Sequence, residues 1–452
     1  MSETKEPPPH RPLKQEQQPA SDEVTEVGPG VLRLQIPILF TGLGHVNCYA
    51  LLDDRGATLV DAGMPGRATW LALSARLKDA GLKIRDIHTV IVTHSHPDHF
   101  GSAGRLAHEA GAELVTERRF HTWLEPKAAF SARRGSTAIH SSPPADGGDH
   151  PGQAGPTQAG PTRAGPTRAG PTRAGPTQAG PTQGGPVQGG GHGHHGHTGG
   201  PDACAELLLP PSADAGGDGA DAGGEGHVAD DDTGYFSIAS RTTPWGGSPI
   251  PHLQRNIWMM RLARWHLLRY MRPPVPTRFV TGGDRLRLAG REWQVVHTPG
   301  HTGDHVCLFD PEAKLLISGD HVLPTITPHV PGLSPLADPL GSYLGSLQGL
   351  RSLGEVSVVL PAHGHPFPDL PGRIDDIVEH HEGRLRELRR ISAAIGTATV
   401  VDLSKELFRP AVWGMMAESE TYAHLEYLRL RGEAERIQLG GQAAYRLAPA
   451  PA

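Results

Sequence analysis

A six-residue run near position 96 combines three imidazoles with one carboxylate. His94, His96, Asp98 and His99 lie in the run His-Ser-His-Pro-Asp-His, which follows an apolar stretch at 87–92. Zinc takes imidazole and carboxylate ligands at about 2.0–2.2 Å, and iron or manganese accept them with less selectivity. Pro97 favours a loop over a regular helix here. His94 and His96 can then reach one metal ion while Asp98 and His99 reach a second; a polar, histidine-rich loop is the alternative.

Three further candidate ligands each follow an apolar stretch. His301 lies in Thr-Pro-Gly-His-Thr-Gly-Asp-His, Asp320 in Ser-Gly-Asp-His and His363 in Pro-Ala-His-Gly-His. A single His or Asp in such a place is usually a capping or surface residue. Because the pattern recurs at separate strand ends, we interpret these residues together as one metal site.

The apolar patterns around these residues predict the elements that position them. Alternating or continuous apolar runs predict strands, and apolar residues at helical spacing predict helices. Strands leading into strand–helix alternation indicate a layered α/β architecture. The expected strands are 31–36, 45–52, 57–60, 87–92, 285–288, 292–297, 305–309, 315–318 and 356–360; the expected helices are about 70–77, 102–110, 253–271 and 340–353.

Two segments lack such patterns. Residues 1–28 are polar, charged and proline-containing, and we expect a disordered tail. The second segment, about 141–232, contains a repeated pentapeptide that begins Gly-Pro-Thr and runs from 155 to 189. It holds too little apolar surface to offset its ordering entropy, so we interpret it as a disordered insertion in a surface loop. Its four histidines at 192, 194, 195 and 197 are a weak alternative metal site.

The last eighty residues predict a separate small module. A charged helix at 375–395 is followed by short helices at 401–407 and 421–431 and by a small β-wing around 437 and 443–446, which is a winged-helix-like pattern. Residues 371–452 carry eleven Lys and Arg against twelve Asp and Glu. Nucleic acid is a possible partner of such a module, but this charge does not support it.

Taken together, these motifs resemble the metallo-β-lactamase superfamily, in particular its glyoxalase II-like hydrolases and the β-lactamase-like protein 2 group. The resemblance covers roughly residues 30–125 and 235–452. It implies an α/β fold, a four-layer αββα metallo-β-lactamase sandwich, with a small C-terminal winged-helix-like domain. It also implies two divalent metal ions, most often Zn²⁺, with Asp61 supporting the site from behind. The first ion would be held by His94, His96 and His301, the second by Asp98, His99 and His363, and Asp320 would bridge both.

The resulting domain hypothesis has three parts: a tail at 1–28, a metallo-β-lactamase domain at 29–370 interrupted at 141–232, and the C-terminal domain at 371–452.

Two ions about 3.5–4 Å apart can hold a hydroxide between them and polarise a scissile bond. Asp98 is the expected catalytic residue, orienting that hydroxide and accepting its proton. We expect hydrolysis of a small-molecule ester, thioester or lactone. The alternatives are a metal-dependent phosphodiesterase or endoribonuclease acting on single-stranded RNA, and a metal-binding protein without turnover.

The remaining signals are weaker. We expect Cys48 and Cys307 in the core, His305 beneath the site, and the pair at 380–381 on a solvated helix face. Substrate contacts are assigned to His321, His329 and His365, and Tyr422 and His424 are expected to approach the cleft from the C-terminal domain. A net charge of −6, three scattered cysteines, and the lack of a signal-like or membrane-length apolar segment predict a cytoplasmic protein without membrane contact.

Overall fold

Three β-sheets organise the part of the chain that the computed structural model describes, which comprises residues 13–38, 42–122, 243–246, 272 and 274–448. The first sheet has seven strands in chain order, antiparallel from β1 to β4 and parallel from β4 to β7. Its strands are β1 (Thr25–Gly28), β2 (Val31–Pro37), β3 (His45–Asp53), β4 (Gly56–Val60), β5 (Ile87–Ile91), β6 (Glu113–Glu117) and β7 (Arg278–Val280).

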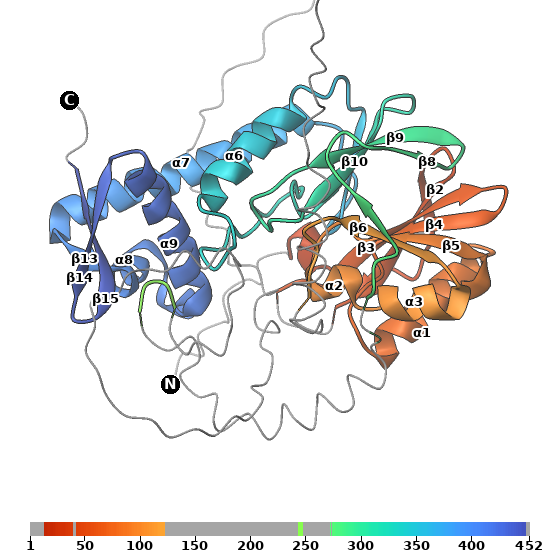
Figure 1. Ribbon diagram of the computed structural model, residues 1–452, viewed down its shortest axis with the longest axis horizontal. Coiled ribbons are helices and arrows are strands. Elements are labelled where there is room, and N and C mark those ends of the chain that lie inside the picture. Colours follow the sequence, from red (N-terminus) through yellow and green to blue (C-terminus); the bar gives the residue numbers. More distant parts are fainter. Residues whose placement is uncertain (1–12, 39–41, 123–242, 247–271, 273, 449–452) are drawn as a thin grey trace, which may run out of the picture. The chain divides into compact units, whose positions relative to one another are not determined.

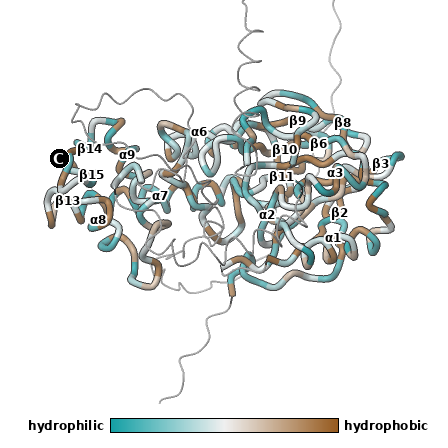
Figure 2. Tube along the Cα trace, turned by 60° about the horizontal axis from the view of Figure 1, so that its bottom comes forward, coloured by the Kyte–Doolittle hydropathy of each residue, from teal (hydrophilic) through white to brown (hydrophobic). Residues whose placement is uncertain are grey.

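The second sheet has five strands in the order β12-β11-β10-β9-β8. Its pairs are antiparallel except for the parallel pair of β11 and β12. The strands are β8 (Arg285–Leu288), β9 (Arg291–His297), β10 (Val306–Asp310), β11 (Leu315–Gly319) and β12 (Val358–Pro361). Figure 2 shows hydrophobic residues along strands of both sheets, as expected for strands covered on two faces.

Side chains that alternate along these strands divide the core into layers. In β10, Leu308 belongs to the cluster between the two sheets, whereas its neighbours Cys307 and Phe309 belong to the cluster on the outer side of the second sheet. Successive residues of a strand point to opposite faces, so both faces of this sheet are covered. The first sheet likewise has an outer cluster that includes Leu73 and Leu106.

Helices supply the two outer layers. On the first sheet lie α1 (Arg67–Asp79) and α3 (Ala103–Ala110). The outer cluster of the second sheet includes residues of α6 (Pro339–Leu350) and α7 (Leu370–Ile395). Both α6 and α7 begin after an aspartate whose side chain accepts a backbone hydrogen bond, with a proline in the first turn, a strong helix start. The layers follow in the order helices, first sheet, second sheet, helices, which confirms the predicted αββα sandwich (Figure 1).

The C-terminal elements form their own hydrophobic cluster. It contains residues of α8 (Val400–Leu407), α9 (Met415–Leu430) and the three-stranded sheet of β13 (Ala398–Thr399), β15 (Gln442–Leu447) and β14 (Ala434–Leu439). The end of α7 contributes Leu388 and Ile391, while its beginning contributes Leu370 and Ile374 to the outer cluster of the second sheet. Because one helix joins both clusters, treating 371–452 as a separate winged-helix-like domain stays a prediction.

A short segment of the chain is inserted into this C-terminal cluster. Trp245 is 1% exposed, its Nε1 donates to Glu418 Oε2 at 3.0 Å, and its ring lies 5.3 Å from that of Tyr422. Ala443 N donates to Trp245 O at 2.9 Å. Through these contacts, Trp245 holds residues 243–246 against α9 and β15.

The structure corrects three expectations. The tail at 1–28 is not disordered throughout, because Gln15–Gln17 forms a 3-10 helix and β1 pairs with β2. Residues 97–100 form a short helix, α2 (Pro97–Phe100), in which Pro97 occupies the first turn, where its missing N–H is not needed. The strands β6 and β7 were not expected. The insertion at 141–232, its histidines and the expected helix at 253–271 lie outside the described residues.

Within the described ranges, no helix combines the length and apolar character that crossing a bilayer requires.

Candidate metal centre

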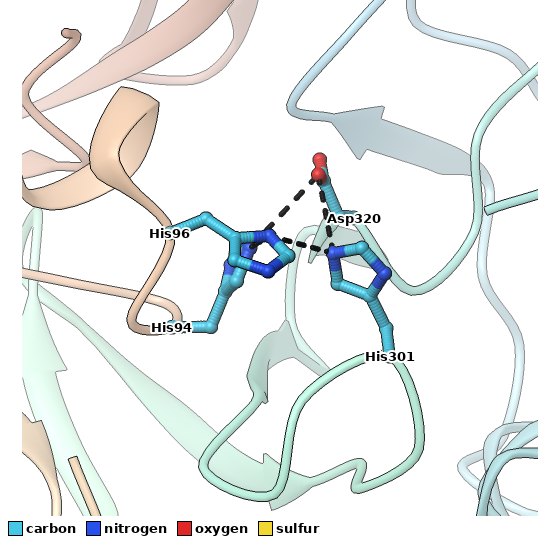
Figure 3. A group of neighbouring side chains, drawn as sticks. All are labelled: His94, His96, His301 and Asp320. Carbon is cyan, nitrogen blue, oxygen red and sulfur yellow. Dashed lines mark hydrogen bonds and ion pairs between the residues drawn. The ribbon is translucent and has the colours of Figure 1, made fainter. Parts of the chain in front are cut away.

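The first group of candidate ligands gathers four side chains from loops that follow strands of both sheets: His94 and His96 after β5, His301 after β9, and Asp320 after β11. His96 Nδ1 lies 2.9 Å from His94 Nε2 and 3.0 Å from His301 Nε2. Asp320 Oδ2 lies 3.9 Å from His94 Nε2 and 3.6 Å from His301 Nε2. Figure 3 shows these side chains converging on one point.

The second group comprises Asp98 and His99, both in α2, and His363, which follows β12. Asp98 Oδ2 lies 3.5 Å from His99 Nε2 and 3.4 Å from His363 Nε2. Asp320 reaches this group too, with Oδ2 3.5 Å from His99 Nε2 and Oδ1 3.2 Å from His363 Nε2. The structure thus brings all seven predicted residues together, with Asp320 between the two groups.

Backbone carbonyls orient two of the imidazoles. His301 Nδ1 donates to His329 O at 2.7 Å, and His363 Nδ1 donates to His45 O at 2.7 Å. A carbonyl oxygen only accepts, so Nδ1 carries the hydrogen in both rings and Nε2 presents its lone pair. Such support on the opposite ring nitrogen is typical of metal-binding histidines.

Asp61 orients the ligands that follow β5. Its carboxylate accepts hydrogen bonds from Thr93 N at 2.9 Å and His99 Nδ1 at 2.8 Å. Thr93 Oγ1 donates to Asp61 Oδ2 at 2.9 Å and lies 3.1 Å from His94 Nδ1, so it can accept the hydrogen of that ring. Asp61 has φ of 61°, a left-handed conformation that non-glycine residues rarely adopt. This strained backbone places one carboxylate behind two candidate ligands.

The resulting arrangement of donors fits bound cations. The Nε2 lone pairs of His94 and His301 both face His96 Nδ1, which can donate a hydrogen to one of them at most. The buried atoms His99 Nε2, His363 Nε2 and Asp320 Oδ1 find no hydrogen-bond partner among the described residues. Buried polar atoms in this state demand an explanation, and a divalent cation held by each group would satisfy them.

Electrostatics separates the two groups. Burial and the neighbouring His301 lower the pKa of His96 to about 3, and burial with the nearby His99 holds the pKa of His94 well below its usual value. Burial also disfavours charge on His99 and His363, but the carboxylates of Asp98 and Asp320 outweigh it and raise both pKa values well above 6.5. Without a cation, protons therefore occupy the second group, and a metal ion must displace them.

Beneath the ligands, His305 holds the backbone of Asp320. Asp320 N donates to His305 Nε2 at 3.1 Å, and His305 Nδ1 lies 2.7 Å from Thr298 Oγ1. Gly319 has φ of 52°, and a Cβ there would lie 2.6 Å from His305 Nε2. A glycine before Asp320 is therefore needed for this contact, and the expectation that His305 lies beneath the site is confirmed.

Other expectations need correction. His381 does not lie on a solvated face: it is 1% exposed, and its Nδ1 lies 3.1 Å from His424 Nε2. The other ring nitrogen of His424, Nδ1, lies 2.8 Å from Glu420 O, and Tyr422 packs on Trp245 and Tyr445. Cys48 and Cys307 are buried as expected, and burial raises the pKa of the Cys307 thiol to about 12.

The sequence patterns also missed several supporting residues. Thr93 precedes His94 directly, so the spacing of the motif could have suggested it. His45 and His329 act through backbone carbonyls, for which side-chain identity gives no signal. His329 also places its Nδ1 3.3 Å from Glu420 Oε2 on α9.

An αββα sandwich with adjoining His/Asp groups at its strand ends defines a class of metal-binding fold. The profile of the metallo-beta-lactamase superfamily matches residues 41–206 and 232–365, and the chain belongs to this superfamily. Its members are typically metal-dependent hydrolases, and the fold usually binds two divalent metal ions.

Curated relatives match a limited part of the chain. The lactamase-like protein nscB of Trichophyton equinum is 37% identical over 107 residues, 24% of this chain and 30% of that protein. The lactamase-like protein aptB of Emericella nidulans is 32% identical over 120 residues, 26% of this chain and 36% of that protein. The match therefore spans about a third of these relatives.

Solved structures show the same fold over most of the chain. A metallo-beta-lactamase family protein from Thermus thermophilus has a TM-score of 0.57 and 23% identity, covering 93% of this chain and 99% of that one. A beta-lactamase domain protein from Burkholderia ambifaria has the same score and identity, covering 96% and 97%. At this identity the likeness concerns the fold alone.

Proposed function

We propose that the protein is a binuclear metal-dependent hydrolase that acts on a small ester, thioester or lactone with activated water. The observation that carries this proposal is the position of Asp320, whose two oxygens reach both ligand groups. His94, His96 and His301 would hold one ion and Asp98, His99 and His363 the other, with Zn²⁺ as the proposed metal. When bound, the ions supply Lewis acidity, which polarises a scissile carbonyl and acidifies water.

The chain's own residues then orient the attacking water and take its proton. Burial raises the pKa of the Asp98 carboxyl, but the imidazoles of His99 and His363 outweigh burial and hold it well below its usual value. In the metal-free protein Asp98 is therefore ionised, which is the form that can accept a proton. No Ser or Cys nucleophile is required. We also propose that the protein belongs to the glyoxalase II-like subgroup, a type of hydrolase that cleaves thioesters.

Charge pairing in the C-terminal region favours a small substrate over RNA. Nine of the eleven basic residues in 371–452 form ion pairs with acidic side chains. Phosphate-backbone binding depends on basic side chains that are available to release counterions. We therefore propose that residues 371–452 form a winged-helix-like region that covers the hydrolase domain and does not bind RNA. We also propose that the enzyme is cytoplasmic.

A substrate screen tests the proposal. Metal-loaded protein would be offered an acyl thioester of a small thiol, a lactone, and a single-stranded RNA oligonucleotide, beside Asp98→Ala as the inactive variant. We expect metal-dependent turnover of the thioester or the lactone that Asp98→Ala abolishes. RNA cleavage lost in Asp98→Ala would establish the endoribonuclease instead, and bound metal without turnover of any of the three would favour a binding protein.

A further inference from the structure

The short segment Lys14–Gln18, here called the N-terminal strap, lies against the loops that carry candidate ligands. It precedes residue 41, where the superfamily match begins. Its contacts reach loops more than 300 residues further along the chain. The proposed chemistry assigns the strap no role, although its central side chain is fully buried.

That side chain is Glu16, which is 0% exposed. Its Oε1 accepts hydrogen bonds from Thr325 N at 2.7 Å and Ile326 N at 3.0 Å, and Thr325 Oγ1 donates to its Oε2. A buried carboxylate is costly unless donors compensate it, and bonds to a charged acceptor are the strong ones. Glu16 thus fixes the backbone at 325–326.

This backbone lies between two parts of the metal centre. Asp320 begins the loop, and His329, whose carbonyl orients His301, ends it. From the other side, Arg373 donates through Nε to Leu323 O and through Nη2 to Ile326 O, both at 2.6 Å. Glu16 binds the amides of the loop and Arg373 binds its carbonyls, so the loop is clamped between the strap and α7.

The strap also supports the second ligand loop. Gln15 Oε1 accepts from His365 N at 3.1 Å, two residues after His363. Gln18 O accepts from His45 Nδ1 at 2.8 Å, and His45 O in turn accepts from His363 Nδ1 at 2.7 Å. One segment of five residues therefore contacts the loop that runs from Asp320 to His329, and also His45, which supports His363.

Two glycines let the strap and the ligand loops approach their neighbours closely. Gly44 N donates to Glu16 O at 2.8 Å, and a Cβ on Gly44 would lie 2.0 Å from Gln18 O. A Cβ on Gly364 would lie 2.6 Å from Pro324 Cγ, between the two ligand loops. Close approach of this kind requires glycine: Gly44 lies against the strap, and Gly364 lies against the other ligand loop at Pro324.

We propose that the N-terminal strap is a positioning element of the metal centre and that Glu16 is its positioning residue, setting the affinity for metal without touching it. The inference rests on the proposed binuclear site. Loss of partners behind metal ligands typically costs about 10- to 100-fold in metal affinity. Because Glu16 acts on the loop and not on a ligand directly, removing its carboxylate should cause a loss at the lower end of that range, about tenfold.

The experiment compares Glu16→Ala and Glu16→Gln with Glu23→Gln, a matched control because Glu23 is an exposed glutamate shortly after the strap. Co²⁺ affinity of metal-free protein would be measured by chelator competition, together with the visible Co²⁺ spectrum and thermal unfolding of the metal-free form. We expect about tenfold weaker binding and a changed spectrum in Glu16→Ala, a smaller loss in Glu16→Gln, and wild-type values in Glu23→Gln.

The readouts separate positioning from stability. A lowered Tm of the metal-free protein with unchanged Co²⁺ affinity and spectrum would overturn the inference, because a merely structural role predicts that combination. If Glu16→Ala does not fold, Glu16→Gln, which keeps the size of the side chain, decides between the same outcomes. Wild-type protein that binds no Co²⁺ would refute the binuclear site itself and the inference with it, whereas equal binding in wild type and Glu16 variants would refute the strap alone.

Discussion

Replacement of Asp61 by Asn should weaken the metal centre without removing a ligand. The carboxylate is 2% exposed and accepts hydrogen bonds from Thr93 N and His99 Nδ1. Both partners are hydrogen-bond donors, so the amide NH₂ of Asn, also a donor, would face one of them and could not accept its hydrogen. If the His99 ring instead moves its hydrogen to Nε2, the lone pair that faces the metal disappears. Either response lowers the affinity of the second group (Asp98, His99 and His363) for its metal ion.

The size of the effect follows from the bond that is lost. A hydrogen bond to a charged group contributes about 1.5–3 kcal/mol, and about 1.4 kcal/mol corresponds to a tenfold change in a binding constant. Asp61→Asn should therefore weaken one metal equivalent by about 10- to 100-fold. The equivalent bound by His94 should weaken less, because Asp61 reaches His94 through Thr93.

The left-handed backbone of Asp61 provides a second, independent readout. Ala in this conformation costs about 1–2 kcal/mol, whereas Asn and Gly adopt it readily. Asp61→Ala and Asp61→Gly should lose metal alike, but denaturant unfolding of the metal-free protein should show the Ala variant as less stable by about 1 kcal/mol. Chelator competition measures the first effect. Asp61→Asn with both equivalents bound as tightly as in the wild type would refute the reasoning.

Three other changes test separate parts of the structure. Trp245→Ala should lower stability by about 3–5 kcal/mol, seen as a lower Tm with metal content unchanged; a wild-type Tm would show that Trp245 does not anchor its segment. Burial and the neighbouring His424 hold the pKa of His381 well below 6.5, so its contribution to stability is present above the unfolded value and is lost as pH falls below about 6.5. His381→Leu should flatten the decline of Tm between about pH 7 and 5, and an unchanged slope would contradict the assignment. Gly44→Ala should reproduce the metal loss of the strap variants, because its Cβ would meet Gln18 O at 2.0 Å; wild-type affinity for Co²⁺ would count against the tight fit.

The candidate site was largely predictable because its side chains stand out locally. His94, His96, Asp98 and His99 crowd into one run, and His301, Asp320 and His363 each follow a strand that apolar residues reveal. What the pattern could not give is the support behind them. His45 and His329 contribute carbonyls, which every residue possesses.

The strap and the short strands escaped prediction for a different reason. Residues 13–28 bury little apolar surface, and Glu16 is held by hydrogen bonds to residues about 310 positions away. No local period records such contacts. β7 has three residues and pairs with β6 from far along the chain, so its apolar content was too small to stand out. Here, tertiary contacts determine structure that local propensity does not.

The central claim is that two ligand groups sharing Asp320 bind two metal ions. Elemental analysis of purified wild-type protein beside His96→Ala and Asp320→Ala tests it most directly. His96 belongs to one group, whereas Asp320 reaches both. We predict two equivalents of divalent metal in the wild type, a sharp fall in His96→Ala and a deeper fall in Asp320→Ala. A wild type without metal after reconstitution, or an Asp320→Ala variant that keeps both equivalents, would contradict the account.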